Sequence, residues 1–165
     1  MSVEFPLRYV PKTITRNDKK KQVNMLLKSK KMYKKHQYYD REKVHSYKST
    51  KSKHIKKAQS IYKIANITPS RELATKTGCS LSALNRIVKK GEGAYYSSGS
   101  RPNQTAQSWG LARLASSLTA GKAAAVDYAI LQKGCDPRKK AFKLAEHSRK
   151  QYKYGLSKTR KATFS

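Results

Sequence analysis

Apolar residues recur every three or four positions through most of the chain, which is the spacing of one buried face of an α-helix. Thr15 and Asp18 open the first of these stretches in the pattern of a capping box. The pattern predicts helices over residues 15–36, 55–65, 68–78, 80–91, 105–119, 122–134 and 136–151. We therefore expect a mostly α fold with a small multi-helix core.

Three segments and the tail lack this periodicity. Residues 1–15 contain two prolines among apolar and β-branched residues, which favours an extended chain. Residues 37–53 interleave tyrosines with lysines, and residues 91–101 are rich in glycine, serine and tyrosine. We expect the preceding helix to end at Gly91 and a loop to follow it. The tail after residue 151 is expected to be extended.

Positive charge dominates the composition. The chain has 38 Lys and Arg against 9 Asp and Glu, a formal net charge of +29, and the excess is greatest in residues 1–66 and 136–165. Self-repulsion of this size destabilises an isolated fold, so we expect a polyanion or an acidic protein surface as partner. The sequence divides into a basic N-terminal arm with one amphipathic helix (1–51), a helical core domain (52–148) and a basic C-terminal arm (149–165).

The two cysteines, Cys79 and Cys135, are too few for a disulfide scaffold. Each follows a glycine that ends a predicted helix, so we interpret them as small apolar residues, and their pairing stays open. No signal peptide and no apolar run long enough to span a bilayer is evident. We expect a soluble protein made in a reducing compartment.

Residues 73–88, LATKTGCSLSALNRIV, form the strongest local motif. They resemble the helix-turn-helix of repressor-type DNA-binding proteins, with Ala74 at the helix contact, Gly78 in the turn and Ser80 as cap of the second helix. The resemblance implies that one face of this helix contacts DNA, through Leu81, Ser82, Asn85, Arg86, Lys89 and Lys90. The same residues also suit a hairpin that only packs, because two short helices at this angle need a glycine, a cap and a small contact residue.

Catalytic and cofactor sites are not indicated. The glycines near residue 91 follow no apolar strand, and the nearest lysine motif of a phosphate loop, in residues 116–123, lacks its first glycine. His36, His45 and His54 are nine residues apart, which places neighbours on opposite helix faces. We expect no enzyme activity, no cofactor, no metal and no small-molecule substrate. Asp127 is predicted to pair with Arg113 or Lys122 rather than to act as a base.

Tyrosines accompany the basic segments and are candidates for partner contacts, because aromatic side chains can stack on bases or anchor a segment in a protein groove. A solvated basic linker is an equally good interpretation of residues 37–53. The predicted partner-binding residues are Tyr9, Tyr33, Tyr38, Tyr39, Tyr47, Tyr95, Tyr96 and Arg101.

Three segments carry a family resemblance: residues 8–35 (RYVPKTITRNDKKKQVNMLLKSKKMYKK), residues 76–91 (KTGCSLSALNRIVKKG) and residues 91–137, which contain the run YYSSGSRPNQT. Together they resemble a small basic protein family of large double-stranded DNA viruses of algae and protists, the chlorovirus and mimivirus-like lineages. The resemblance implies a viral protein, with a virion component as the expected role, and supplies no catalytic residues.

Together, the positive net charge, the basic arms and the resemblance to the viral family predict a minor capsid protein that bridges capsid subunits of a large icosahedral DNA virus. Its expected partners are major and minor capsid proteins, with DNA as a further candidate. The expected location is the inner face of the capsid, after synthesis in the host cytoplasm. The alternative is a helix-turn-helix protein that is packaged with the viral genome or regulates it. A third candidate role is association with RNA or the ribosome.

Overall fold

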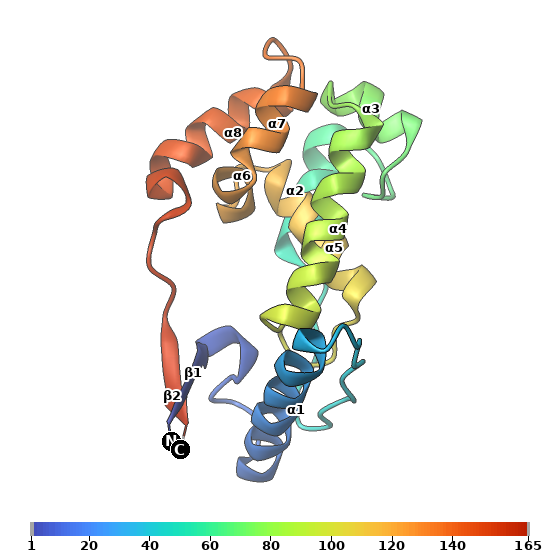
Figure 1. Ribbon diagram of the computed structural model, residues 1–165. Helices are drawn as coiled ribbons and strands as arrows, with labels where there is room; N and C mark the ends of the chain where they lie inside the picture. Colours follow the sequence, from blue (N-terminus) through green and yellow to red (C-terminus); the bar gives the residue numbers. More distant parts are fainter. Residues whose placement is uncertain (1, 165) are drawn as a thin grey trace. The chain divides into compact units, whose positions relative to one another are not determined.

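A computed structural model describes residues 2–164, and it confirms the mostly α fold (Figure 1). Most of its ordered elements are helices, with two short strands near the chain ends. In chain order they are β1 (Val3–Pro6), the 3₁₀ helix η1 (Leu7–Tyr9), α1 (Arg16–Lys34), α2 (Lys53–Tyr62), α3 (Arg71–Thr77), α4 (Leu81–Ser97), α5 (Ala106–Ser117), α6 (Lys122–Val126), α7 (Tyr128–Gly134), α8 (Lys140–Gln151), the 3₁₀ helix η2 (Lys153–Gly155) and β2 (Lys161–Phe164).

The chain forms two compact units, and the boundary falls inside α4 and α5. Unit 1 contains the residues up to Thr50, Glu92–Trp109 and the residues from Lys158 on. Unit 2 contains Lys51–Gly91 and Gly110–Ser157. Both chain ends, which we expect to be arms, belong to unit 1.

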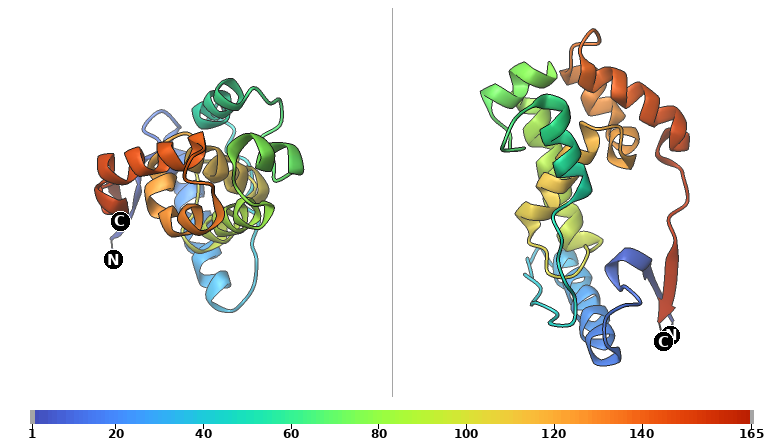
Figure 2. Two further views of the ribbon diagram at one scale, coloured as in Figure 1. Left: turned by 90° about the horizontal axis from the view of Figure 1, so that it is seen from above. Right: turned by 180° about the vertical axis from the view of Figure 1, so that it is seen from behind.

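In unit 1 the two chain ends pair with each other. β1 and β2 are antiparallel, with Val3 opposite Phe164 and Pro6 opposite Lys161, and they lie side by side in all views (Figures 1 and 2). Behind them, apolar residues from the N-terminal segment pack against α1. This buried cluster is Phe5, Tyr9, Val10, Ile14, Met25, Leu26 and Val44. The N-terminal segment therefore supplies much of the core of unit 1.

Arg41 fixes the aperiodic segment after α1 within unit 1. Its guanidinium lies 3.8 Å from the centroid of the Tyr95 ring and donates hydrogen bonds to the Tyr95 carbonyl (2.7 Å) and to the hydroxyl groups of Ser29 and Ser100. Ser29 in turn donates to the carbonyl of Tyr96 at 2.9 Å. These bonds satisfy carbonyl groups at the C-terminal end of α4, which lack partners within the helix. Burial lowers the pKa of Arg41.

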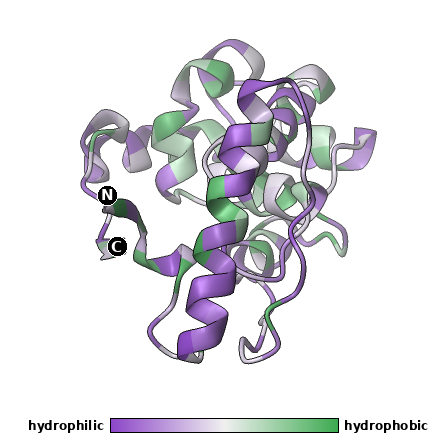
Figure 3. Ribbon diagram, turned by 60° about the horizontal axis from the view of Figure 1, so that its bottom comes forward, coloured by the Kyte–Doolittle hydropathy of each residue, from purple (hydrophilic) through white to green (hydrophobic). Residues whose placement is uncertain are grey.

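Unit 2 packs its helices around one apolar cluster. Leu73, Leu84, Ile87, Leu114 and Leu131 are all fully buried in it. In the whole ribbon, hydrophobic stretches recur between hydrophilic ones along the helices, as helices with one buried face require (Figure 3). Burial of such side chains stabilises by about 1.5–3 kcal/mol each, which makes this cluster the main source of stability of the unit.

The predicted end of a helix at Gly91 is wrong, because α4 continues through residues 91–97. Gly91 is there for packing: a Cβ atom on it would lie 2.6 Å from the Cα of Gly110. The turn comes later, at Gly99, where φ is +121° and a Cβ would meet Leu26 at 2.7 Å. Gly91 therefore allows two helix backbones to approach closely, and Gly99 adopts a left-handed turn conformation that other residues rarely adopt.

Two smaller boundaries also differ from prediction. The expected helix over residues 122–134 is broken at Asp127 into α6 and α7, since the buried Asp127 side chain is held by cations of other helices. The helix predicted over residues 68–78 begins later, because Ser70 is the cap of α3 and its hydroxyl accepts a hydrogen bond from the Leu73 amide at 3.1 Å. The glycine stop at Gly78 is confirmed, with φ +77°.

The two glycines inside α4 should respond to alanine in opposite ways. Gly91→Ala should destabilise by about 1–3 kcal/mol, because its methyl group meets backbone that cannot move aside. Gly93→Ala should stabilise by about 0.5–1 kcal/mol, because no atom lies within 4 Å of its added Cβ and alanine favours helix. Urea unfolding of both variants measures the difference. Equal midpoints for the two variants would contradict the close contact at Gly91.

Candidate nucleic-acid interface

The helix-turn-helix motif forms through local bonds around its turn. Gly78 ends α3 in the left-handed region and donates to the Ala74 carbonyl at 2.9 Å. The Ser80 hydroxyl then caps α4 by accepting a hydrogen bond from the Ala83 amide at 3.1 Å. The Thr77 hydroxyl donates to the Leu73 carbonyl and accepts from the Cys79 amide, so the turn between the helices is held at several points.

The buried face of α4 defines its exposed face. Ala83, Leu84, Ile87 and Val88 are buried against the core of unit 2. The six residues that we expect to contact DNA alternate with these buried pairs along the sequence and are all exposed: Leu81, Ser82, Asn85, Arg86, Lys89 and Lys90. No carboxylate occurs in α4 before Glu92. The structure thus brings these residues together on one solvent-facing side of a helix.

A second turn, between α7 and α8, docks on the helix-turn-helix turn. The Ser80 amide donates to the Gly134 carbonyl at 2.7 Å, and the Asp136 amide donates to the Gly78 carbonyl at 2.8 Å. Between these bonds Cys79 and Cys135 form a disulfide. The pairing that the sequence left open is therefore settled in the structure, and both cysteines are also buried in the apolar core of unit 2, as interpreted from the sequence. The start of α4 is fixed covalently as well as by packing.

This docking adds positive charge beside the turn. A Cβ on Gly78 would meet the Lys139 side chain at 2.5 Å, which places Lys139 directly against the turn. Arg138 is 88% exposed and pairs with Asp136 at 3.2 Å. The side-chain hydrogen bond from Arg138 lowers the pKa of Asp136, so this carboxylate stays ionised and offsets one local charge. Lys139 and Lys140 are exposed.

Asp127 fixes the position of Lys90. Its carboxylate is fully buried and accepts two hydrogen bonds from Arg113, at 2.7 and 2.8 Å. The Lys90 ammonium lies 3.1 Å from the same carboxylate. The predicted pair of Asp127 with Arg113 is confirmed, whereas no sequence pattern predicted the contact with Lys90. Lys122 donates instead to the Ser157 carbonyl at 2.9 Å.

The predicted partner-binding tyrosines of unit 1 fall into two groups. Tyr9 and Tyr95 are buried, Tyr9 edge-on to Trp109 with ring centroids 6.0 Å apart and Tyr95 against Arg41. Tyr33 and Tyr38 are 37% and 67% exposed and pack in a row with Tyr96. The first group forms internal contacts, and the second stays accessible.

The other predicted partner-binding residues, Tyr39, Tyr47 and Arg101, lie at the surface of unit 1. Lys28 lies over the ring of Tyr39 at 4.4 Å, and Tyr47 and Arg101 line one pocket. Burial and a hydrogen bond to Asp40 raise the pKa of Tyr96 to about 12, so its hydroxyl stays protonated and donates. Arg41 holds together α1, the segment that follows it and the C-terminal end of α4. No sequence pattern predicted this role, because a lone arginine in a basic segment resembles its neighbours.

Comparison with known proteins assigns the chain to a family. The model of a family of unknown function (DUF5824) matches residues 6–141. The chain belongs to the DUF5824 family. No curated protein and no solved structure matches it. The part that matches DUF5824 includes all of α3 and α4 and the turn that docks on them.

In residues 2–164 no three His, Cys, Asp or Glu residues are grouped closely enough to hold a metal ion. No helix in the same range combines the length and apolar character that a membrane crossing needs.

Loss of the disulfide should destabilise unit 2. The bond joins residues 56 positions apart, and its removal should lower the free energy of unfolding by about 4 kcal/mol through the entropy of the unfolded chain. Urea unfolding of the protein with and without reductant measures this. The double variant Cys79→Ala/Cys135→Ala should unfold like the reduced protein and ignore reductant. Equal midpoints for oxidised and reduced protein would contradict the prediction.

Asp127→Ala should lower the free energy of unfolding by about 3 kcal/mol, because it leaves Arg113 without its buried carboxylate. Thermal unfolding of the purified variant measures this loss. The control is Asp136→Ala, which removes a carboxylate from a pair with the exposed Arg138 and should shift the melting temperature much less. An Asp127→Ala variant that melts with the wild type would refute the structural role of this pair.

Proposed function

We propose that this protein binds duplex DNA, with the exposed face of α4 in the major groove. The observation that carries the proposal is that all six predicted contact residues lie exposed on one side of a helix that carries no acid until Glu92. The opposite side of α4 is buried in the core, and its first turn is tied by the disulfide. A reading helix must be held in this way to present side chains to base edges in a fixed register.

The side chains on this face suit base recognition. The Asn85 amide can pair with the edge of adenine and the Arg86 guanidinium with guanine, each through two hydrogen bonds. Lys89 and the exposed cations of the docked turn, Lys139 and Lys140, suit phosphate contacts that set position without reading sequence. We expect Lys90 to contribute less to DNA binding than Lys89, because its ammonium group is already paired with Asp127.

The net charge of +29 supports the same proposal. Cations that neutralise phosphates release counterions, and this term supplies most of the non-specific affinity of proteins for DNA. An acidic protein surface would attract the chain as well, so the preference for DNA rests on the exposed face of α4 and not on the charge.

The minor capsid role is the second proposal, and it rests on the viral resemblance and on the charge. Its premise was that extended ends reach neighbouring subunits. In the structure the two ends pair as β1 and β2. A DNA-binding protein packaged with the genome accommodates the resemblance and the charge without needing free arms.

Selection from a random duplex library tests the DNA proposal. At a salt concentration that suppresses non-specific binding, the wild-type protein should enrich a short motif. Asn85→Ala and Arg86→Ala should each lower affinity for that motif about tenfold or more and relax one base position. Lys150→Ala removes a charge from the exposed C-terminal turn of α8 and should weaken binding to all sequences slightly and equally.

Two results would contradict the proposal. One is a wild-type protein that enriches no motif at any salt concentration. The other is a motif whose affinity depends on Lys150 as strongly as on Asn85 and Arg86, since binding would then follow total charge rather than the face of α4.

A further inference from the structure

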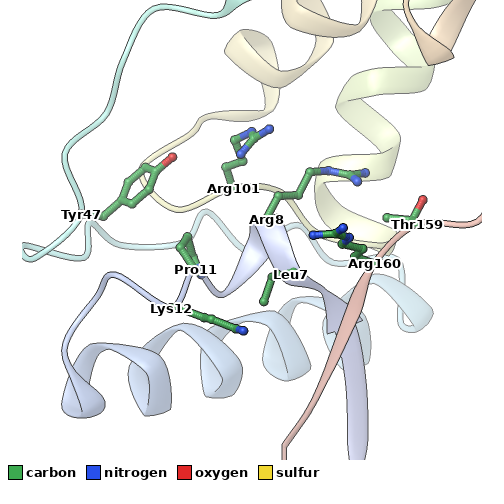
Figure 4. A pocket seen from close by; sticks show the side chains of 8 residues that line it. All are labelled: Leu7, Arg8, Pro11, Lys12, Tyr47, Arg101, Thr159 and Arg160. Atoms are coloured by element: carbon green, nitrogen blue, oxygen red, sulfur yellow. The ribbon is translucent and has the colours of Figure 1, made fainter.

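Unit 1 contains a pocket of about 480 Å³ that the proposed role of α4 does not use (Figure 4). Four cationic side chains line it, from Arg8, Lys12, Arg101 and Arg160, and no Asp or Glu does. The Arg8 and Arg160 side chains extend toward each other above η1, the Arg101 side chain extends upward beyond Arg8, and Lys12 extends away below (Figure 4). None of the three arginines forms an ion pair with a carboxylate of the described residues. The pocket size is that of a small-molecule site.

Pairing of the chain ends brings two of these arginines together. Arg8 lies in η1, directly after β1, and Arg160 directly precedes β2. The Leu7 amide donates to the Arg160 carbonyl at 2.8 Å, which extends the β1–β2 pairing to this point. The Arg8 guanidinium also lies 5.1 Å from the centroid of the Tyr9 ring, an arrangement that favours a fixed orientation of the cation.

The third arginine is held by the SGSRPN segment, residues 98–103, that follows α4. The neighbouring Ser100 is 1% exposed; its hydroxyl donates to the Arg101 carbonyl and accepts from Arg41. Gly99, in the left-handed region, lies against Tyr9, where a Cβ would be 3.0 Å from the ring. The backbone at Arg101 is thus set by buried contacts, although the side chain itself is exposed.

The same segment positions the aromatic wall of the pocket. The Asn103 side chain accepts from the Val44 amide at 2.6 Å and donates to the carbonyls of Val44 and Tyr47. These bonds fix the chain at Tyr47, whose ring lies at the side of the pocket (Figure 4). The buried hydrogen bonds of Ser100 and Asn103 therefore shape this pocket.

We propose that this pocket binds a small ligand with two or more adjacent phosphate groups. Guanidinium groups that line one pocket repel each other, and an anion bound among them removes that repulsion. Guanidinium pairs with phosphate through two parallel hydrogen bonds, so three arginines suit several phosphate oxygens at once. The ligand chemistry is an oligophosphate chain, either free or as part of a nucleotide whose base contacts Tyr47.

Calorimetric titration of the purified full-length protein with tripolyphosphate and with ATP tests this proposal. The wild type should bind with a stoichiometry of one, and Arg101→Ala and Arg160→Ala should each weaken binding about tenfold or more. Lys34→Ala removes one exposed charge of α1 outside the pocket and should change the affinity less than about twofold. Arg101→Lys keeps the charge but not the guanidinium group, so it should lose only part of the affinity. This conservative variant is the control for a folding defect in Arg101→Ala.

The two probes separate the two sources of the phosphates. Equal affinity for both means that the phosphate chain alone is bound. Tighter binding of ATP that Tyr47→Leu abolishes means that the ligand is a nucleotide. Arg86→Ala on α4 should leave either affinity unchanged, so the result is independent of the proposal for DNA.

Three results would overturn the pocket proposal. The first is a wild-type titration with several weak sites and no stoichiometric one. The second is an equal loss of affinity in Lys34→Ala and Arg101→Ala, which would mean general attraction to a basic protein. The third is binding that depends on Arg101 for single-stranded oligonucleotides but is absent for both small probes, which would assign these arginines to a nucleic-acid backbone.

Discussion

A shortage of acids constrains how this protein holds its charged side chains. With 38 Lys and Arg against 9 Asp and Glu, most cations cannot pair with a carboxylate. Several lie over aromatic rings instead, as Arg41 does over Tyr95 and Arg149 over Tyr128. Such contacts stabilise by about 0.5–2 kcal/mol, which is at least as much as an exposed ion pair contributes. They leave the positive charge uncompensated at long range, and this is the property that attracts a polyanion.

Among the ion pairs of the described residues, Asp127 is the acid whose side chain is fully buried, and it shapes the local structure of unit 2. A carboxylate that is removed from water needs partners close by, and Asp127 obtains them from α4 (Lys90) and α5 (Arg113). It sits where the chain passes from α6 to α7, and the predicted single helix is interrupted at that residue. The buried Asp127 carboxylate thereby links α4, α5 and the junction of α6 and α7, and the spacing of apolar residues does not predict these links.

Local patterns predicted much of this structure, because they depend on neighbours in sequence. The periodicity of residues 80–91 places Asn85 and Arg86 opposite Leu84 and Ile87, and the structure confirms that division. Gly91 was misassigned because a glycine that ends a helix and one that permits close helix contact look alike in sequence. Pairing of Cys79 with Cys135 depends on how two turns meet in space, and periodicity does not report that.

The arginine pocket could not be predicted for the same reason: Arg8, Arg101 and Arg160 come from three distant segments. Their arrangement matters because a long polyanion and a small one respond to charge differently. A nucleic acid gains from every exposed cation along its path, so the overall charge already favours it. A small oligophosphate gains only where several cations face the same volume, and a high net charge alone does not create such a place. In unit 1 the pairing of the chain ends and the buried bonds of Ser100 and Asn103 create one, so this pocket can select a ligand that the rest of the surface would bind only weakly.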